Sequence, residues 1–188
     1  VDRYEGASLL GPRAVATDSA GSLFFTDSGA FGETGLHDAR GSVYCVSNAK
    51  TGLMLVPVAL GCLAAPWGIA VSPDGSVVYV AEFATNRVLR FVQRPAGVYH
   101  GTVFCQLSGG MGPSALALSS SGKLYVATYD MAEVSSQGRV LVVGTDGEVE
   151  SKLVLPAPEI TDMSLSADGE WLFVAEASTG SVFRVAAV

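Results

Sequence analysis

The sequence lacks an excess of positive charge. Eleven Lys and Arg residues stand against 18 Asp and Glu residues, so the formal net charge is −7 at pH 7. Nucleic acids and anionic membrane surfaces both attract proteins with a positive face, and we therefore expect neither as a partner. Long apolar runs are also missing. No stretch approaches the ~20 uninterrupted apolar residues that cross a bilayer, so we predict no membrane span.

The chain contains few cysteines, and their number is odd. Cys45, Cys62 and Cys105 are the three cysteines of the chain, and each lies among apolar residues of an expected strand. An odd count without the framework of a small secreted domain is not typical of a disulfide scaffold. We expect three buried thiols that act as small apolar side chains, which favours a reducing compartment.

A sustained helical period is absent as well. Glycine is abundant instead, with 22 residues, while charged residues make up 15% and hydrophobic residues 49%. Sparse charge and frequent glycine suit many short strands joined by tight turns, and 188 residues can bury a sizeable core. The sequence therefore predicts one all-β domain over residues 1–188.

A pattern of apolar strand, polar turn and apolar strand occurs four times. The copies read AVATDSAGSLFFTDS at 14–28, GIAVSPDGSVVYVAEF at 68–83, ALALSSSGKLYVATY at 115–129 and DMSLSADGEWLFVAEA at 162–177. Their turn glycines recur at intervals of about 50 residues, at Gly21, Gly75, Gly122 and Gly169. Strand repeats of this length are typical of a β-propeller in which each repeat forms one four-stranded blade.

The expected blades are repeats at about 11–64, 65–109, 110–156 and 157–188, and the last repeat ends after its third strand. Residues 1–10 could supply the missing outer strand and close a small four-bladed ring. Alternatively, the four blades are part of a six-bladed ring, and the terminal blade leaves an edge that could pair with a strand of another chain.

In a propeller, the links from each outer strand to the next inner strand meet at one mouth of the central channel. These links place Arg13, Trp67, Ser114 and Thr161 at the mouth, with Asp162 beside Thr161. A tryptophan there could stack on a ligand, because its ring offers a flat apolar face and an N–H donor. It could equally fill a narrow channel.

Acidic side chains end the second strands at the same face. Asp27, Glu82 and Glu176 occupy equivalent positions, and the long loop after 129 adds Asp130. Three carboxylates at one face could hold a hard cation such as calcium. The alternative is that each carboxylate pairs locally, as charged residues at strand ends commonly do.

Residues 66–91, PWGIAVSPDGSVVYVAEFATNRVLRF, and 110–128, GMGPSALALSSSGKLYVAT, resemble the strictosidine-synthase-like and gluconolactonase (senescence-marker-type) propellers and the related NHL repeats. The resemblance covers nearly the whole chain and implies a propeller, six-bladed in typical members. It also implies a divalent metal, usually calcium, held by an Asn and an Asp at the starts of inner strands. Trp67 and Ser114 stand at those two positions, and neither suits calcium. We therefore expect no metal and no cofactor.

From these observations we expect a non-catalytic propeller with a decayed metal site that binds a small molecule or a protein at the channel mouth. The alternative is a lactonase-like, esterase-like or strictosidine-synthase-like enzyme acting on a small molecule there. Calcium is possible in that case, with Asp27, Glu82, Asp162 and Glu176 replacing the missing ligands. No nucleophile or zinc motif decides whether the chain is an enzyme.

Overall fold

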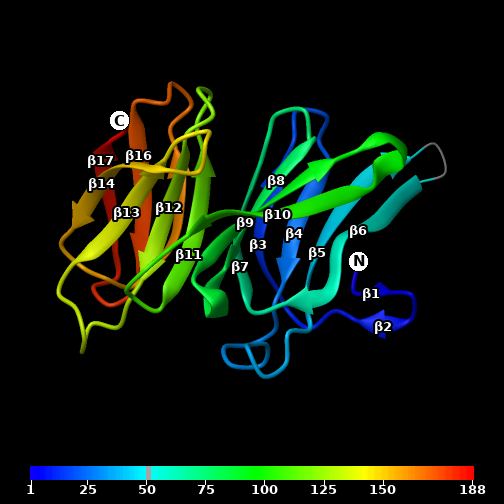
Figure 1. The fold of residues 1–188 in the computed structure, drawn as a ribbon, viewed down its shortest axis with the longest axis horizontal. Helices are drawn as coiled ribbons and strands as arrows, with labels where there is room; N and C mark the ends of the chain where they lie inside the picture. The colour runs from blue at the N-terminus through cyan, green and yellow to red at the C-terminus, as the bar shows by residue number, and fades with distance from the viewer. Residues whose placement is uncertain (50–51) are drawn as a thin grey trace.

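The computed structural model describes residues 1–49 and 52–188, which consist almost entirely of β-strands (Figure 1). Four antiparallel sheets, the blades, follow one another along the chain in a propeller-like ring, which confirms the predicted all-β propeller. In the described part of the chain, no helix is long and apolar enough to cross a membrane.

Each blade is a meander in which every strand pairs with the next. Blade 1 contains β3 (Pro12–Thr17), β4 (Leu23–Asp27), β5 (Gly41–Ala49) and β6 (Gly52–Leu63). Blade 2 contains β7 (Pro66–Val71), β8 (Val77–Glu82), β9 (Arg87–Gln93) and β10 (Tyr99–Gln106), with 3-10 turns η1 (Phe83–Thr85) and η2 (Pro95–Gly97). Blade 3 contains β11 (Gly112–Leu118), β12 (Leu124–Tyr129), β13 (Gly138–Val143) and β14 (Val149–Leu155). Blade 4 contains β15 (Ile160–Leu165), β16 (Trp171–Glu176) and β17 (Ser181–Ala186).

Local turn chemistry explains why the inner hairpins form where the repeats predict them. Between β7 and β8, Asp74 Oδ1 accepts hydrogen bonds from Ser72 Oγ at 2.6 Å and from the Ser76 amide at 3.1 Å. Gly75 then adopts a φ of 71°, which glycine reaches at little cost. The turn between β15 and β16 repeats this arrangement with Asp168 and Gly169.

The core lies between neighbouring blades. The inner strands β3, β7, β11 and β15 contact one another in that order around the axis. Three apolar clusters join blades 1 and 2, blades 2 and 3, and blades 3 and 4. Between β7 and β11 the backbones approach so closely that a Cβ on Gly68 would lie 2.8 Å from Ala115 Cα. Among the described residues no such cluster joins blade 4 to blade 1.

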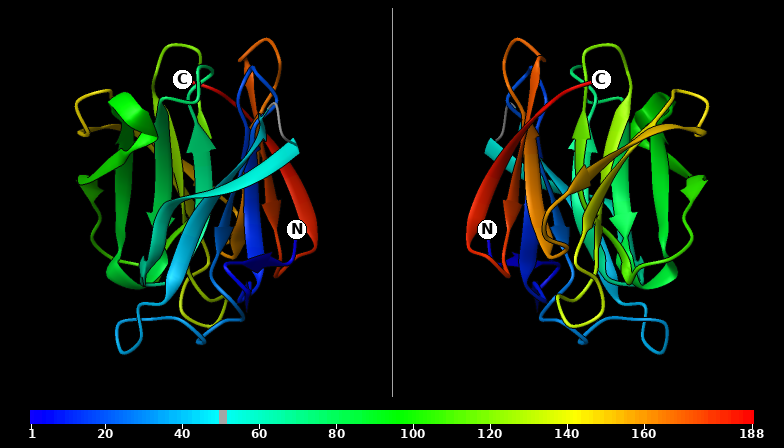
Figure 2. Two further views of the ribbon diagram at one scale, coloured as in Figure 1. Left: turned by 90° about the vertical axis from the view of Figure 1, so that its right-hand side faces the viewer. Right: turned by 90° about the vertical axis from the view of Figure 1, so that its left-hand side faces the viewer.

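The N-terminal segment does not provide the outer strand of blade 4, which was one of the two alternatives for residues 1–10. Strands β1 (Arg3–Tyr4) and β2 (Ala7–Ser8) pair with each other, since Glu5 and Gly6 both have positive φ and form a tight hairpin turn. Tyr4 packs on Tyr44 of blade 1, with ring centroids 5.4 Å apart. Blade 4 therefore has three strands in the described chain, with β17 outermost (Figure 2).

The prediction of three buried thiols is wrong for one of them. Cys105 is buried and Cys45 is half-buried, but Cys62 is exposed. Cys62 lies near the end of β6, an outer strand with a neighbour on one side only and with water beyond the other. All three cysteines are free thiols.

Candidate functional site

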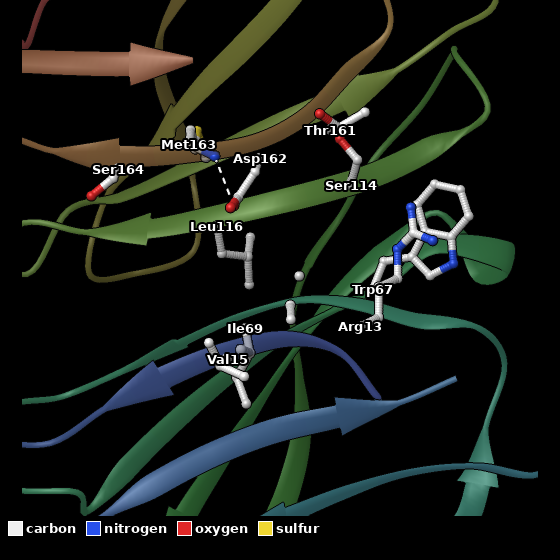
Figure 3. A pocket seen from close by; sticks show the side chains of 12 residues that line it. Arg13, Val15, Trp67, Ile69, Ser114, Leu116, Thr161, Asp162, Met163 and Ser164 are labelled. Carbon is white, nitrogen blue, oxygen red and sulfur yellow. Dashed lines mark hydrogen bonds between the residues drawn. The ribbon is translucent and has the colours of Figure 1, made fainter. Parts of the chain in front are cut away.

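A cavity of about 420 Å³ opens where the inner strands begin, and all four blades contribute to its wall (Figure 3). The five residues predicted at the channel mouth all line it. The complete lining is Arg13, Ala14, Val15, Trp67, Gly68, Ile69, Ser114, Leu116, Thr161, Asp162, Met163 and Ser164. The repeat pattern thus placed equivalent residues of the four blades around one space.

Arg13 and Trp67 form a layered stack at one side of this cavity. The Arg13 Cζ atom lies 3.7 Å from the centroid of the Trp67 ring. The Trp67 indole also stacks on the ring of Phe83, with ring centroids 3.7 Å apart and ring planes 15° apart. Trp67 is only 4% exposed, so it fills the core and also supports the guanidinium. Burial lowers the pKa of Arg13, but arginine side chains in proteins stay protonated at neutral pH.

Ser114 and Asp162 bring unpaired polar atoms to the same cavity. Ser114 is 3% exposed, and its Oγ has no hydrogen-bond partner among the described residues. Asp162 Oδ1 accepts the Met163 amide at 2.9 Å, which leaves Oδ2 free within the described chain. Thr161 Oγ1 donates to the Ala175 carbonyl at 3.4 Å. Figure 3 shows Thr161 beside Ser114, with Asp162 further along β15.

The second-strand carboxylates, predicted at the ligand-binding face, do not line the cavity and are hydrogen-bonded within their own blades. Asp27, Glu82 and Glu176 are 1–3% exposed, and each holds the loop that enters its own blade. Asp27 accepts the amides of Leu10 at 3.0 Å and Gly11 at 2.7 Å. In blade 3 the equivalent residue is Thr128, whose Oγ1 donates to the Arg139 carbonyl at 3.3 Å. We call the three acidic residues the carboxylate clamps and assign them a structural role.

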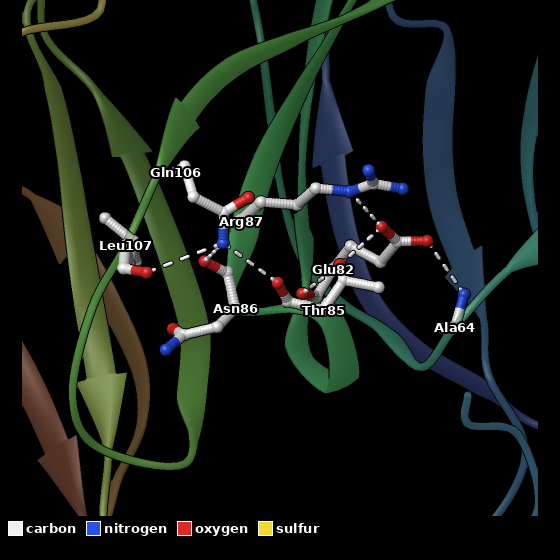
Figure 4. Close-up of polar contacts among 7 residues, drawn as sticks. All are labelled: Ala64, Glu82, Thr85, Asn86, Arg87, Gln106 and Leu107. Carbon is white, nitrogen blue, oxygen red and sulfur yellow. Dashed lines mark hydrogen bonds and ion pairs between the residues drawn. The ribbon is translucent and has the colours of Figure 1, made fainter.

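Glu82 shows how a carboxylate clamp works (Figure 4). Its Oε1 accepts the Ala64 amide at 2.9 Å, while its Oε2 accepts Thr85 Oγ1 and pairs with Arg87 Nε at 2.5 Å. The carboxylate thereby joins the entry to β7 with the turn between β8 and β9. Local pairing, the alternative we gave for these residues, is therefore what the structure forms.

Glu176 is the most heavily hydrogen-bonded of the clamps. Its carboxylate accepts the Glu159 amide at 3.1 Å, together with the amides and hydroxyls of Ser178 and Thr179. Burial raises the pKa of Glu176, but the hydrogen bonds from Ser178 and Thr179 outweigh burial and hold the pKa at about 2. Asp130, the remaining predicted acid, accepts the Met131 amide at 3.0 Å and does not line the cavity.

The residues at the mouth do not fit calcium. Calcium takes six to eight oxygen ligands, usually with several carboxylates. Asp162 is the one carboxylate in the lining, and the guanidinium of Arg13 lines the same cavity. Within residues 1–49 and 52–188 no group of three or more His, Cys, Asp or Glu side chains could hold a metal ion.

The aromatic cluster behind Trp67 was not predicted from the sequence. Phe83, Phe31 and Tyr129 surround the indole, with ring centroids 3.7, 5.7 and 6.0 Å from it. A signal was present, because Phe83 and Tyr129 stand at equivalent positions of the repeats in blades 2 and 3, one residue after Glu82 and Thr128. Two rings at corresponding positions of neighbouring blades can meet where the blades converge.

A comparison with known protein families shows which family this chain belongs to. The family model described as SMP-30/Gluconolactonase/LRE-like region matches residues 6–178. The chain belongs to this family. Two curated members carry the name Lactonase drp35. The protein of Staphylococcus haemolyticus (strain JCSC1435) is 30% identical over 160 residues, which is 82% of this chain and 45% of that relative. That of Staphylococcus epidermidis (strain ATCC 35984 / DSM 28319 / BCRC 17069 / CCUG 31568 / BM 3577 / RP62A) is 33% identical over 144 residues, 74% of this chain and 40% of that relative.

Solved structures support the same fold. A gluconolactonase from Xanthomonas campestris superposes with a TM-score of 0.74 at 23% identity, over 99% of this chain and 60% of that one. A protein described as calcium-binding regucalcin, from Agrobacterium tumefaciens, superposes with a TM-score of 0.74 at 22% identity. The match covers 93% of this chain and 60% of that one. This family member thus spans about half the length of the curated relatives it matches.

The comparison with these relatives overturns the function that we expected. We expected a non-catalytic binding propeller, and that reading is contradicted because the similar curated relatives are named lactonases. They favour the alternative, a hydrolase acting on a small molecule. The absence of two metal ligands at Trp67 and Ser114 had favoured the non-catalytic reading, and the names of these relatives outweigh it.

Proposed function

We propose that this chain is a lactonase-type hydrolase that opens small cyclic esters in the cavity at the starts of the inner strands. The observation that carries the proposal is the convergence of Arg13, Ser114 and Asp162 on one cavity, in a chain 30% identical to a protein named Lactonase drp35. These three side chains supply a positive charge, a hydroxyl and a carboxylate at one place.

The size and lining of the cavity suit a small ring compound. Its volume of about 420 Å³ lies within the range of roughly 300–1,000 Å³ that is usual for small-molecule sites. The apolar part of the wall includes Val15, Ile69 and Leu116. The rest of the wall is rich in polar groups, which can orient a small polar substrate.

The hydrolysis needs a base for water and positive groups for the oxyanion. The water oxygen attacks the ester carbonyl carbon, and Asp162 Oδ2 takes the proton that water loses. Negative charge then builds on the carbonyl oxygen, where the guanidinium of Arg13 and the hydroxyl of Ser114 donate hydrogen bonds. The ring C–O bond breaks, the ring oxygen takes the proton back from Asp162, and the product is an open-chain hydroxy acid.

Proton release from δ-gluconolactone and γ-butyrolactone, followed in a pH-stat above the spontaneous rate, tests this proposal. We expect hydrolysis by the wild-type chain and a fall in kcat/KM of about 100-fold or more for Asp162→Asn, since a positioned base contributes at least that much. Asp168→Asn is the matched control, because Asp168 lies in the hairpin turn of the same blade at the other end of β15. No hydrolysis by the wild type, or equal rates for both variants, would refute the proposal.

A further inference from the structure

A second cavity of about 420 Å³ lies between blades 1 and 2, at the far ends of β3 and β7 from the channel mouth. Its lining is Asp18, Ser22, Phe24, Cys45, Ser47, Val56, Asp74, Gly75, Gln93, Gly97 and Tyr99, and none of these residues lines the cavity at the mouth. The two hairpin turns beside it are joined directly, since the Ser19 amide donates to the Pro73 carbonyl at 2.8 Å. The cavity is thus framed by fixed turns of two blades.

Two carboxylates lie on the wall of this cavity without a positive partner. The described residues that line it include no Lys, Arg or His, and neither Asp18 nor Asp74 forms an ion pair with a described residue. Asp18 Oδ1 accepts the amides of Ala20 at 2.9 Å and Ser22 at 2.8 Å, while no described donor reaches Oδ2. A free carboxylate oxygen is a strong acceptor for a charged N–H donor.

Asp74 brings a second negative charge close to the first. Hydrogen bonds from the Ser72 hydroxyl and from the amide and hydroxyl of Ser76 lower the pKa of Asp74 to about 2. The Asp18 carboxylate reaches the same turn, because a Cβ on Gly75 would lie 2.7 Å from Asp18 Oδ2. Like charges held near each other repel, and a positive ligand would relieve that repulsion.

The rest of the wall is neutral and partly apolar. Burial raises the pKa of Cys45 to about 11, and the charge of Asp18 adds to this increase. Burial also raises the pKa of Tyr99 to about 12, with smaller contributions from Cys45 and Asp18. Both groups therefore stay protonated at neutral pH. Phe24 and Val56 add apolar surface, so the cavity combines two negative charges with aromatic and aliphatic groups.

We propose that this cavity binds a small aliphatic diamine, with one ammonium group at Asp18 and the other at Asp74. The alkyl chain between the ammonium groups lies against Phe24 and Val56. An ammonium group donates up to three hydrogen bonds, and the free Oδ2 of Asp18 accepts one of them. Calcium suits the cavity less well, because it takes six to eight oxygen ligands and gains nothing from apolar surface. This site is separate from the lactonase cavity and does not depend on the proposed function.

Calorimetric titration with cadaverine tests the proposal. The matched probe is the diol in which hydroxyl groups replace both ammonium groups on the same five-carbon chain. We expect the wild type to bind one cadaverine and not to bind the diol. Asp18→Asn should weaken cadaverine binding by about 10-fold or more, the size expected for one hydrogen bond to a charged group. Asparagine keeps the Oδ1 acceptor for the Ala20 and Ser22 amides, so the turn is retained.

The chain provides a matched control in blade 4. Asp168 occupies the place in the β15–β16 turn that Asp74 occupies in the β7–β8 turn, and it accepts hydrogen bonds from Ser166 and Glu170. It does not line the cavity between blades 1 and 2. Asp168→Asn should therefore bind cadaverine like the wild type.

A second variant keeps both carboxylates and fills the space instead. Ser47 lies on β5 and lines the cavity, so Ser47→Leu should also weaken cadaverine binding. It tests the site even if Asp18→Asn does not fold. Circular dichroism and thermal unfolding establish that each variant is folded. Lactone hydrolysis should be unchanged in both variants, because the two cavities share no residue.

The proposal is overturned if the wild type binds no cadaverine or binds the diol equally well. Equal losses in Asp18→Asn and Asp168→Asn would also overturn it, because they would indicate diffuse attraction of a dication to a chain of net charge −7. Wild-type affinity in folded Asp18→Asn or Ser47→Leu would show that cadaverine binds elsewhere.

Discussion

Replacing Glu176 by Gln should destabilise the fold in a pH-dependent manner. The Glu176 carboxylate accepts hydrogen bonds from three amides and two hydroxyls, at distances of 2.5–3.1 Å. A Gln side chain retains one acceptor oxygen. Its NH2 group would face the Thr179 amide, which then loses its partner, and the remaining bonds would lose the help of the negative charge.

The size of the effect follows from these contacts. A hydrogen bond to a charged group contributes about 1.5–3 kcal/mol, so we expect Glu176→Gln to lower the free energy of unfolding by ~2–3 kcal/mol at neutral pH. For a chain of 188 residues each kcal/mol shifts Tm by roughly 2–4 °C. The Tm should therefore fall by about 4–12 °C.

The pH dependence provides the sharper test. Because folding lowers the pKa of Glu176 from 4.5 to about 2, its contribution to stability is present above the ordinary pKa and is lost as the pH falls from 4.5 towards 2. The difference between wild type and Glu176→Gln should therefore shrink to roughly half or less near pH 3. Calorimetry of both proteins at pH 3 and 7 measures it.

Glu170→Gln is the control for this experiment. Glu170 lies in the turn of the same blade with an exposed side chain, and its replacement should change stability by no more than about 0.5 kcal/mol. A difference between wild type and Glu176→Gln that is equal at pH 3 and 7 would show that the carboxylate charge does not hold the loop.

Two further predictions concern packing and thiol chemistry. Gly68→Ala should cost ~1–3 kcal/mol in urea unfolding, since its Cβ would lie 2.8 Å from Ala115 Cα and overpacking carries costs of this size; an unchanged midpoint would contradict the close approach of β7 and β11. At about pH 8 the exposed Cys62 should react with Ellman's reagent first, because burial raises the pKa of Cys45 and of Cys105 to about 11 and leaves little thiolate on either. A rapid phase that survives Cys62→Ser would contradict that order.

The sequence predicted the fold well because the repeats carry their own turn signals. Asp74 and Gly75, and again Asp168 and Gly169, form the hairpin turns that their residue types favour. The mouth residues were predicted for the same reason, since equivalent positions of a repeat meet around one axis. Arg13 and Thr161 come from the first and the last blade and still line the same cavity.

The orientation of the acidic side chains could not be predicted from the sequence. Asp27, Glu82 and Glu176 each accept at least one backbone amide of the loop that enters their own blade. Backbone amides are present at nearly every residue, so no residue pattern indicates which of them a carboxylate will reach. The hairpin of residues 3–8 was missed because it depends on the positive φ of Glu5, a residue that seldom adopts one.

The stack of Arg13, Trp67 and Phe83 also gives the cavity an intrinsic optical probe. An indole held 15° from parallel to a phenyl ring sits in a rigid, chiral aromatic environment, which gives strong near-ultraviolet circular dichroism. The charge of Arg13 lies 3.7 Å from the same ring, so an anion that pairs with Arg13 changes the electric field at the indole and shifts its fluorescence. In a Trp171→Phe background Trp67 is the sole tryptophan. Occupancy of the cavity can then be followed in real time without any label.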